Sequence, residues 1–149
     1  MEPDKRTNLL DLNRAGMESF VVGMGEKPFR ARQLMKWIYR RATGDFEAMT
    51  DLGKDFRRRL ADTAKISVPD VLISQNSSDG TRKWLLRVDS GQAIEMVFIP
   101  EPGRGTLCIS SQLGCAMDCT FCSTAQQGLN RNLSTAEILG QVWLCLLYT

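Results

Sequence analysis

Three cysteines near the end of the sequence have the type and spacing of a metal-binding loop. Cys115, Cys119 and Cys122 lie close together, directly after Gly114. Thiolates at this spacing cannot all point into a hydrophobic core, but they can surround one small inorganic centre. A closed zinc or iron–sulfur site takes four protein ligands, and no fourth cysteine or histidine lies nearby. Three ligands therefore indicate a cluster with one iron left open, and three thiols buried as small hydrophobic groups are the less favoured alternative.

The longer sequence around this loop resembles a known enzyme family. The pattern C-x3-C-x2-C, with the aromatic residue Phe121 before the last cysteine, is the signature of the radical S-adenosylmethionine (radical SAM) enzymes. Residues 106–115 and 122–133 are similar to the bacterial dual-specificity methyltransferases that modify carbon 2 of an adenine in 23S rRNA and in tRNA. The similarity covers about residues 8–143, but it covers well under half of the family's usual length.

The resemblance implies radical chemistry. Carbon 2 of adenine lies between two ring nitrogens and is too electron-poor to attack the methyl group of SAM directly. By resemblance, Cys115, Cys119 and Cys122 hold one [4Fe-4S] cluster per chain, whose open iron binds SAM and passes an electron into its sulfonium. The family then transfers carbon from a methyl group carried on a protein cysteine. This sequence has no position that matches that methyl-carrying cysteine.

The resemblance also assigns roles to two residues outside the loop. Cys108 matches the cysteine that resolves the protein–substrate adduct by forming a transient disulfide bond. Glu95 matches the proton acceptor that takes the carbon-2 proton and restores the aromatic ring. From the pattern alone, Cys108 is a buried strand thiol and Glu95 is a polar residue facing out of a strand. Both assignments therefore depend on the match.

Hydrophobic periodicity predicts three short amphipathic helices in the first part of the chain, at 14–24, 31–41 and 52–64. Asn13 is suited to cap the first of these helices, and Gly25 is suited to end it. The next part is rich in Val, Ile and Leu, with turn signals at Asp79-Gly80 and Ser90-Gly91. It predicts a β-meander with strands at 71–74, 83–88 and 94–99.

The remaining sequence reads as a strand at 106–110, the cysteine loop, and a helix that starts at the capping box Ser134 to Glu137. In the family this is the first β-α unit of the radical SAM barrel. The predicted fold class is therefore α/β with an α+β N-terminal part. We expect a helical accessory RNA-binding domain, a β-meander or linker, and a truncated start of the radical SAM core, at residues 1–67, 68–105 and 106–149.

The end of the sequence departs from the family. Residues 142–148 are an unbroken apolar run, too short to span a membrane, where the family has a helix with a charged outer face. One strand and one helix cannot close a barrel. We therefore expect an N-terminal fragment that has no activity alone, and we assign Cys145 no role.

The basic residues are concentrated in one region. Ten Lys/Arg and four Asp/Glu fall between Lys27 and Arg59, a net charge of +6 in a chain of +2. The helical pattern predicts that Arg57, Arg58 and Arg59 are displayed on one helix and that Arg32, Lys36 and Arg40 form a ridge on another. Such runs are usually solvated helix faces. Beside an RNA-modifying site, we expect both to contact phosphates.

The composition and the first residues of the sequence indicate the expected location and partners of the protein. The sequence lacks eighteen consecutive apolar residues, begins with a polar segment and has five unevenly spaced cysteines, so we expect a cytoplasmic protein without a membrane partner. We also expect a monomer. Its expected partners are 23S rRNA, tRNA and an external one-electron donor. Two alternatives stay open: a related methyltransferase that acts on carbon 8 of adenine in rRNA, and a non-catalytic metal-binding, RNA-binding module that holds zinc.

Overall fold

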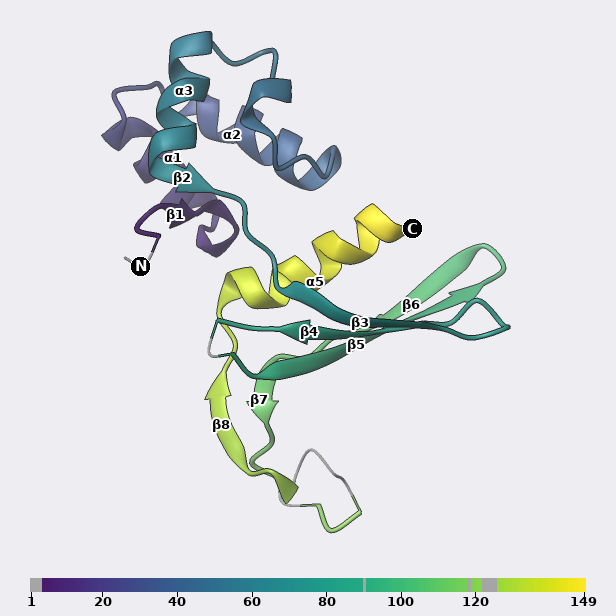
Figure 1. Ribbon diagram of the computed structural model, residues 1–149. Helices are drawn as coiled ribbons and strands as arrows, with labels where there is room; N and C mark the ends of the chain where they lie inside the picture. The colour runs from purple at the N-terminus through teal and green to yellow at the C-terminus, as the bar shows by residue number, and fades with distance from the viewer. Residues whose placement is uncertain (1–3, 90, 118, 122–125) are drawn as a thin grey trace. The chain divides into compact units, whose positions relative to one another are not determined.

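The computed structural model describes residues 4–89, 91–117, 119–121 and 126–149. The chain divides into two compact units, Met1–Ser67 and Val68–Thr149 (Figure 1). Both helices and strands are present, in agreement with the predicted mixed α/β class. The finer domain division, with a further boundary at residue 105, stays a prediction.

Unit 1 is helical. Its elements are β1 (Thr7–Asn8), the 3-10 helix η1 (Leu9–Asp11), α1 (Arg14–Gly23), α2 (Phe29–Met35), the π-helix η2 (Lys36–Arg40), the 3-10 helix η3 (Phe46–Ala48), α3 (Lys54–Thr63) and β2 (Ala64–Lys65). The short strands β1 and β2 pair in parallel and join the two ends of the unit. The side chains that are fully buried in its core include Leu9, Leu10, Met17, Val21, Leu34, Ile38 and Leu60.

The residues that were expected to begin and end the first helix do so. The side chain of Asn13 accepts a hydrogen bond from the Gly16 backbone N–H at 2.8 Å, so it caps the first turn of α1. Gly25, just beyond the end of α1, has φ +80°, a conformation that glycine adopts without strain. The second predicted helix forms as two segments, because its second half, η2, is a π-helix.

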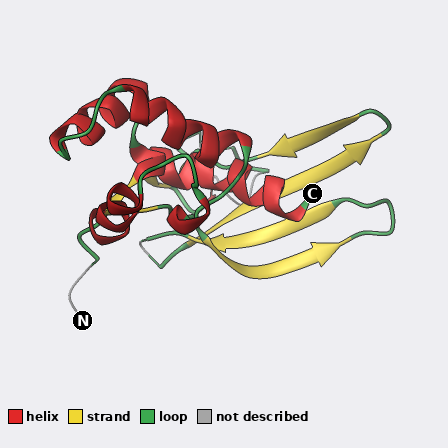
Figure 2. Cartoon of the chain, turned by 90° about the horizontal axis from the view of Figure 1, so that it is seen from above, coloured by secondary structure: helices red, strands yellow, loops and turns green. Residues whose placement is uncertain are grey.

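Unit 2 is built on an antiparallel sheet. Its strands are β3 (Asp70–Asn76), β4 (Arg82–Arg87), β5 (Ala93–Glu101) and β6 (Arg104–Cys108), paired in the order β3-β4-β5-β6. Gly80 and Gly91 take positive φ in the first two turns, as the turn signals indicated. The β3–β4 and β5–β6 turns lie at the same end of the sheet (Figure 2).

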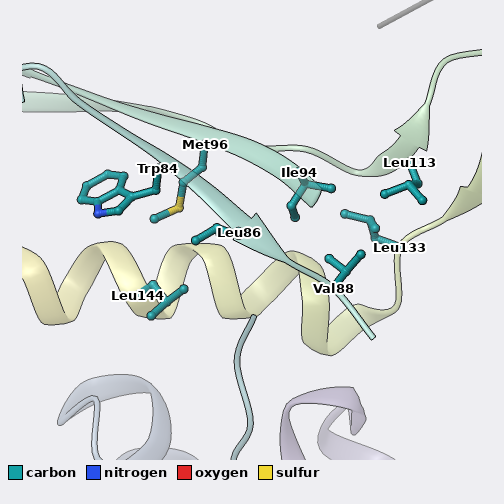
Figure 3. Close-up of a cluster of buried hydrophobic side chains, with 8 residues drawn as sticks. All are labelled: Trp84, Leu86, Val88, Ile94, Met96, Leu113, Leu133 and Leu144. Atoms are coloured by element: carbon teal, nitrogen blue, oxygen red, sulfur yellow. The ribbon is translucent and has the colours of Figure 1, made fainter. Parts of the chain in front are cut away.

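One face of this sheet packs on helix α5 (Thr135–Tyr148). A cluster of buried side chains joins the sheet, the helix and the chain before it: Trp84, Leu86, Val88, Ile94, Met96, Leu113, Leu133 and Leu144 (Figure 3). The predicted capping box is confirmed, because Ser134 Oγ accepts from the Glu137 N–H at 3.1 Å and the Glu137 carboxylate accepts from the Ser134 N–H at 2.8 Å.

The connection from the sheet to α5 differs from the prediction. The strand expected at 106–110 ends at Cys108 and pairs with β5 in antiparallel orientation. A separate two-stranded antiparallel pair, β7 (Gln112–Gly114) and β8 (Leu129–Asn132), then carries the cysteine loop. The sequence pattern gave no signal for this pair, because both strands are short and polar. The barrel of which this part would form the beginning stays a prediction.

Candidate active site

Strand register places Glu95 and Cys108 on the same face of the sheet. Along β5, Ile94 and Met96 point into the core, so Glu95 and Val97 face the opposite way. Val97 lies directly across from Cys108 of β6, and residues opposite each other share a face. Glu95 and Cys108 are therefore diagonal neighbours, and strand geometry places their Cα atoms about 7–8 Å apart. The face that α5 leaves uncovered carries both predicted catalytic residues.

Lys83 joins this face, although the sequence analysis did not single it out. Its ammonium Nζ lies 2.7 Å from the Glu95 carboxylate, and both side chains are exposed. Lys83 of β4 is paired with Val97 of β5, so it sits diagonally from Glu95 on the same side of the sheet. Only the strand register brings these two charges together, and no local sequence pattern could have shown it.

A hollow of about 520 Å³ lies beside Glu95. Its lining combines the uncovered sheet face with the base of the cysteine loop: Leu85, Gln92, Ala93, Ile94, Glu95, Ser110, Gln112, Leu113, Gly114 and Gln127. The carboxylate, the hydroxyl and several amide groups make it a polar hollow in which a planar heterocycle could form hydrogen bonds. Glu95 and the start of the loop thus border one hollow.

Gly114 pinches the base of the cysteine loop. Its φ is +76°, and a Cβ at this position would lie 1.7 Å from the carbonyl oxygen of Gly128. The Cys115 N–H donates to that same oxygen at 3.2 Å. Only glycine allows this close approach, so the two ends of the loop meet at Gly114 and Gly128.

Gly114→Ala is expected to lower the free energy of unfolding by about 2 kcal/mol or more, since it adds a backbone clash to the strain of positive φ. Gly128→Ala is the matched control. It also places alanine at positive φ, +68°, but its Cβ meets no atom within 4 Å. We expect a loss of only about 1 kcal/mol there. Chemical denaturation of the two variants measures both free energies of unfolding. Equal losses of this free energy would refute the close approach of Gly114 to the Gly128 carbonyl oxygen.

The described cysteines of the loop are partly exposed thiols. Cys115 Sγ accepts a hydrogen bond from the Met117 N–H at 3.4 Å, and the Cys119 thiol lies 3.9 Å from the Met117 carbonyl oxygen. Cys122, the third predicted ligand, lies outside the described residues. Within the described part of the chain, no three potential metal ligands come together. The described cysteines 108, 115, 119 and 145 are all free thiols.

A buried carboxylate anchors the start of α5 to β8. Glu137 is 5% exposed, and both of its oxygens lie 2.7 Å from guanidinium nitrogens of Arg131. It also accepts from the backbone N–H groups of Ser134 and Asp89. The Arg131 guanidinium above all, with these N–H donors, lowers the pKa of Glu137 to about 2.

The prediction that Arg57, Arg58 and Arg59 are all displayed is wrong. Arg57 is buried, and its guanidinium donates to the Glu47 carbonyl oxygen at 2.5 Å. Arg59 forms ion pairs with Glu26 and Asp55. These two residues hold α3 against its neighbours, which a helical periodicity could not reveal. Reversing their charge would destabilise the unit before it tested any RNA contact.

The ridge formed by Arg32, Lys36 and Arg40 is exposed as predicted. None of the three forms an ion pair with another described residue. The ridge borders a hollow of about 480 Å³ that Arg14 and Tyr39 also line. Four residues of an α-helix turn slightly more than a full circle, whereas four residues of a π-helix turn slightly less. The rotation from Lys36 to Arg40 in η2 therefore offsets the rotation from Arg32 to Lys36. The three cations therefore stay in line.

Comparison with known proteins shows similarity to a methyltransferase family. The model of the ribosomal RNA large subunit methyltransferase N-terminal domain matches residues 7–66. Dual-specificity RNA methyltransferase RlmN of Alkalilimnicola ehrlichii is 62% identical over 137 residues, which cover 92% of this chain and 38% of that protein. Residues 7–66 match this domain family, and 92% of the chain is similar to this methyltransferase. The protein of the same name from Francisella tularensis subsp. novicida is 55% identical over 97% of the chain and 38% of its own length.

A solved structure from the same class is also similar. The crystal structure of a radical SAM methyltransferase from Sphaerobacter thermophilus superposes with a TM-score of 0.83 at 39% identity. The match covers 93% of this chain and 41% of that one. The chain thus spans well under half the length of the family relatives that it matches. None of the helices in the described part of the chain is long and apolar enough to cross a bilayer.

Proposed function

We propose that this chain is part of a radical SAM methyltransferase that acts on carbon 2 of a specific adenine in 23S rRNA and in tRNA. The observation that carries the proposal is the uncovered face of the sheet in unit 2. Glu95 and Cys108 are neighbours there, and Glu95 borders the hollow that ends at Gly114, where the cysteine loop begins.

Cys115, Cys119 and Cys122 would hold a [4Fe-4S] cluster, which when bound with SAM supplies one-electron chemistry. The described part of the loop fits this role. Its thiols are free and partly exposed, and the N–H donated to Cys115 Sγ is the kind of hydrogen bond that tunes cluster potentials. The loop also closes at its base through Gly114, which directly precedes Cys115.

Glu95 and Cys108 would complete the reaction from the sheet face. A Glu95 oxygen would accept the carbon-2 proton of the adenine, as general-base catalysis requires. Lys83 would hold that carboxylate in place through their 2.7 Å ion pair. The Cys108 thiolate would resolve the protein–substrate adduct by forming a transient disulfide bond with the methyl-carrying cysteine. The carbon–sulfur bond between that cysteine and the substrate would break at the same time, and its electron pair would stay on the substrate carbon, which takes up a proton.

The ridge of Arg32, Lys36 and Arg40 would bind the RNA backbone. Its cations are exposed, aligned and without ion-pair partners among the described residues, so they are available to phosphates. Contacts of this kind position a folded RNA without reading its sequence. The proposal places the enzyme in the cytoplasm as a monomer supplied by an external one-electron donor.

Anaerobic reconstitution with iron and sulfide, followed by electron paramagnetic resonance of the reduced chain, tests the proposal. A [4Fe-4S] signal that shifts when SAM is added is the expected result. Serine in place of Cys115, Cys119 or Cys122 is expected to remove nearly all of that signal. A colourless chain that holds zinc tightly would overturn the proposal in favour of a metal-binding module.

Two further cysteines provide matched controls. Cys108→Ser and Cys145→Ser remove thiols that are not proposed ligands, so the cluster signal should stay at the level of the unchanged chain. Loss of the signal in either control would contradict the assignment of the three ligands. For the intact enzyme, mass spectrometry of digested RNA separates methylation at carbon 2 from methylation at carbon 8.

A further inference from the structure

Gln141 is a fully buried amide whose polar groups are all directed at backbone atoms. Its side chain is 0% exposed in the middle of α5. Gln141 Oε1 accepts from the Ser110 N–H at 2.8 Å, and Nε2 donates to the Ser110 carbonyl oxygen at 2.7 Å. Nε2 also donates to the Glu137 carbonyl oxygen at 3.1 Å. The side chain thus pairs with Ser110 as a neighbouring strand would.

Ser110 lies where the chain leaves the main sheet. The last register pair between β5 and β6 joins Val97 to Cys108, so the pairing ends two residues before Ser110. The Ser110 hydroxyl still donates to the Glu95 carbonyl oxygen at 2.8 Å. The chain then enters β7, which leads to Gly114 and the loop. Ser110 is therefore the point at which β5, β6 and the loop's stem are connected.

We propose that Gln141 is a positioning residue, which fixes Ser110 and so sets the position of the loop's stem relative to Glu95 and Cys108. This inference rests on the proposed function, which assigns roles to the loop, to Glu95 and to Cys108. Gln141 itself touches neither substrate nor cluster. It acts through Ser110, whose backbone it holds and whose hydroxyl reaches Glu95.

The chemistry of the side chain explains why an amide is needed. Only a group that accepts and donates at once satisfies both the N–H and the carbonyl oxygen of Ser110. A leucine of similar size removes the partner of both groups at this half-buried residue. An ionised carboxylate can accept from the N–H but repels the carbonyl oxygen. Each loss removes the restraint on Ser110 and leaves the apolar contacts of α5 intact.

Hydrogen exchange followed by nuclear magnetic resonance on the 149-residue chain tests this restraint. In Gln141→Leu, the protection factor of the Ser110 amide is expected to fall about tenfold or more. The resonances of residues 109–114 are expected to broaden, while amides in β4 and α5 keep their protection. Unchanged protection at Ser110 would overturn the inference.

Two control variants separate positioning from general stability. Glu137→Gln weakens the anchor of α5 without touching Ser110, so it should lower the unfolding temperature and leave the Ser110 amide protected. Val142→Ala, on the outer side of the same helix, should change neither quantity. Loss of Ser110 protection in Glu137→Gln equal to that in Gln141→Leu would mean that Gln141 has only a structural role.

Gln141→Glu covers the case in which the leucine variant does not fold. Below the pKa of the introduced carboxyl, the protonated group can again donate to the Ser110 carbonyl oxygen. Protection at Ser110 should then recover at least severalfold relative to the ionised form. Equal protection factors in both ionisation states would contradict the inference, because they would show that the donated hydrogen bond is not needed.

A spectroscopic measurement connects the restraint to the cluster. A nitroxide label on Cys108 is relaxed by the reduced, paramagnetic cluster according to their separation. Gln141→Leu should broaden the range of distances between the label and the cluster, and Glu137→Gln should not. An unchanged relaxation rate in Gln141→Leu would refute the positioning role. If the unchanged chain takes up no cluster, the proposed function fails, while the amide measurement still decides the role of Gln141.

Discussion

Replacing Arg32, Lys36 and Arg40 together with glutamate is expected to weaken binding of tRNA to the chain by about 100-fold at low salt. The physical reason is the loss of three phosphate contacts and the release of counterions that goes with them. The slope of log K against log salt should become shallower by about 3 units. A salt titration of the binding constant measures both quantities.

The fold should survive this substitution. The three side chains are exposed and form no ion pairs with other described residues, so their replacement leaves no buried partner uncompensated. Circular dichroism of the variant should match that of the unchanged chain. This is the difference from Arg57, whose guanidinium is buried against the Glu47 carbonyl oxygen.

A second triple variant provides the charge-matched control. Lys5, Lys27 and Lys54 are exposed cations of the same unit that do not line the hollow beside the ridge. Replacing them with glutamate changes the net charge by the same amount. We expect a much smaller loss of affinity, because only long-range attraction is altered. Equal losses in the two triples would show that net charge, and not the ridge, governs RNA binding.

The stability of unit 2 is expected to fall as the pH drops from about 5 to 2, because Glu137 becomes protonated. The folded-state pKa of Glu137 is about 2, below its ordinary value of 4.5. A depressed pKa contributes stability above the unfolded-state value, and that stability is lost as pH falls through the folded value. The whole contribution is about 3 kcal/mol. Thermal unfolding at a series of pH values measures it.

Glu137→Gln isolates this effect from other acidic groups. Asp4 and Asp79 also have lowered pKa values, held down mainly by hydrogen bonds from Arg6 and Thr81 respectively, so they add to the acid dependence of the unchanged chain. Their contribution remains in the variant. The difference between the two pH profiles should therefore shrink toward zero at pH 2 and be largest near neutrality. A difference that does not vary with pH would contradict the role of the Arg131–Glu137 pair.

The sequence alone determined the features that depend on neighbours along the chain. The Asn13 cap, the capping box at Ser134 and Glu137, and the positive-φ turn at Gly80 are local hydrogen bonds and backbone preferences, and they formed as predicted. The clustering of the cysteines was equally visible from their spacing, and their shared ligation stays a prediction. The exposure of the ridge also followed from helical periodicity.

Tertiary structure decided the features that depend on residues far apart in sequence. Register between β5 and β6 placed Glu95 beside Cys108, and register between β4 and β5 brought Lys83 to Glu95. Packing of α3 buried Arg57, which its basic neighbours had suggested was exposed. The hydrogen bonds from Gln141 to Ser110 likewise join two segments across the fold. Such contacts follow from how elements pack, and a pattern along the chain does not record which distant groups will meet.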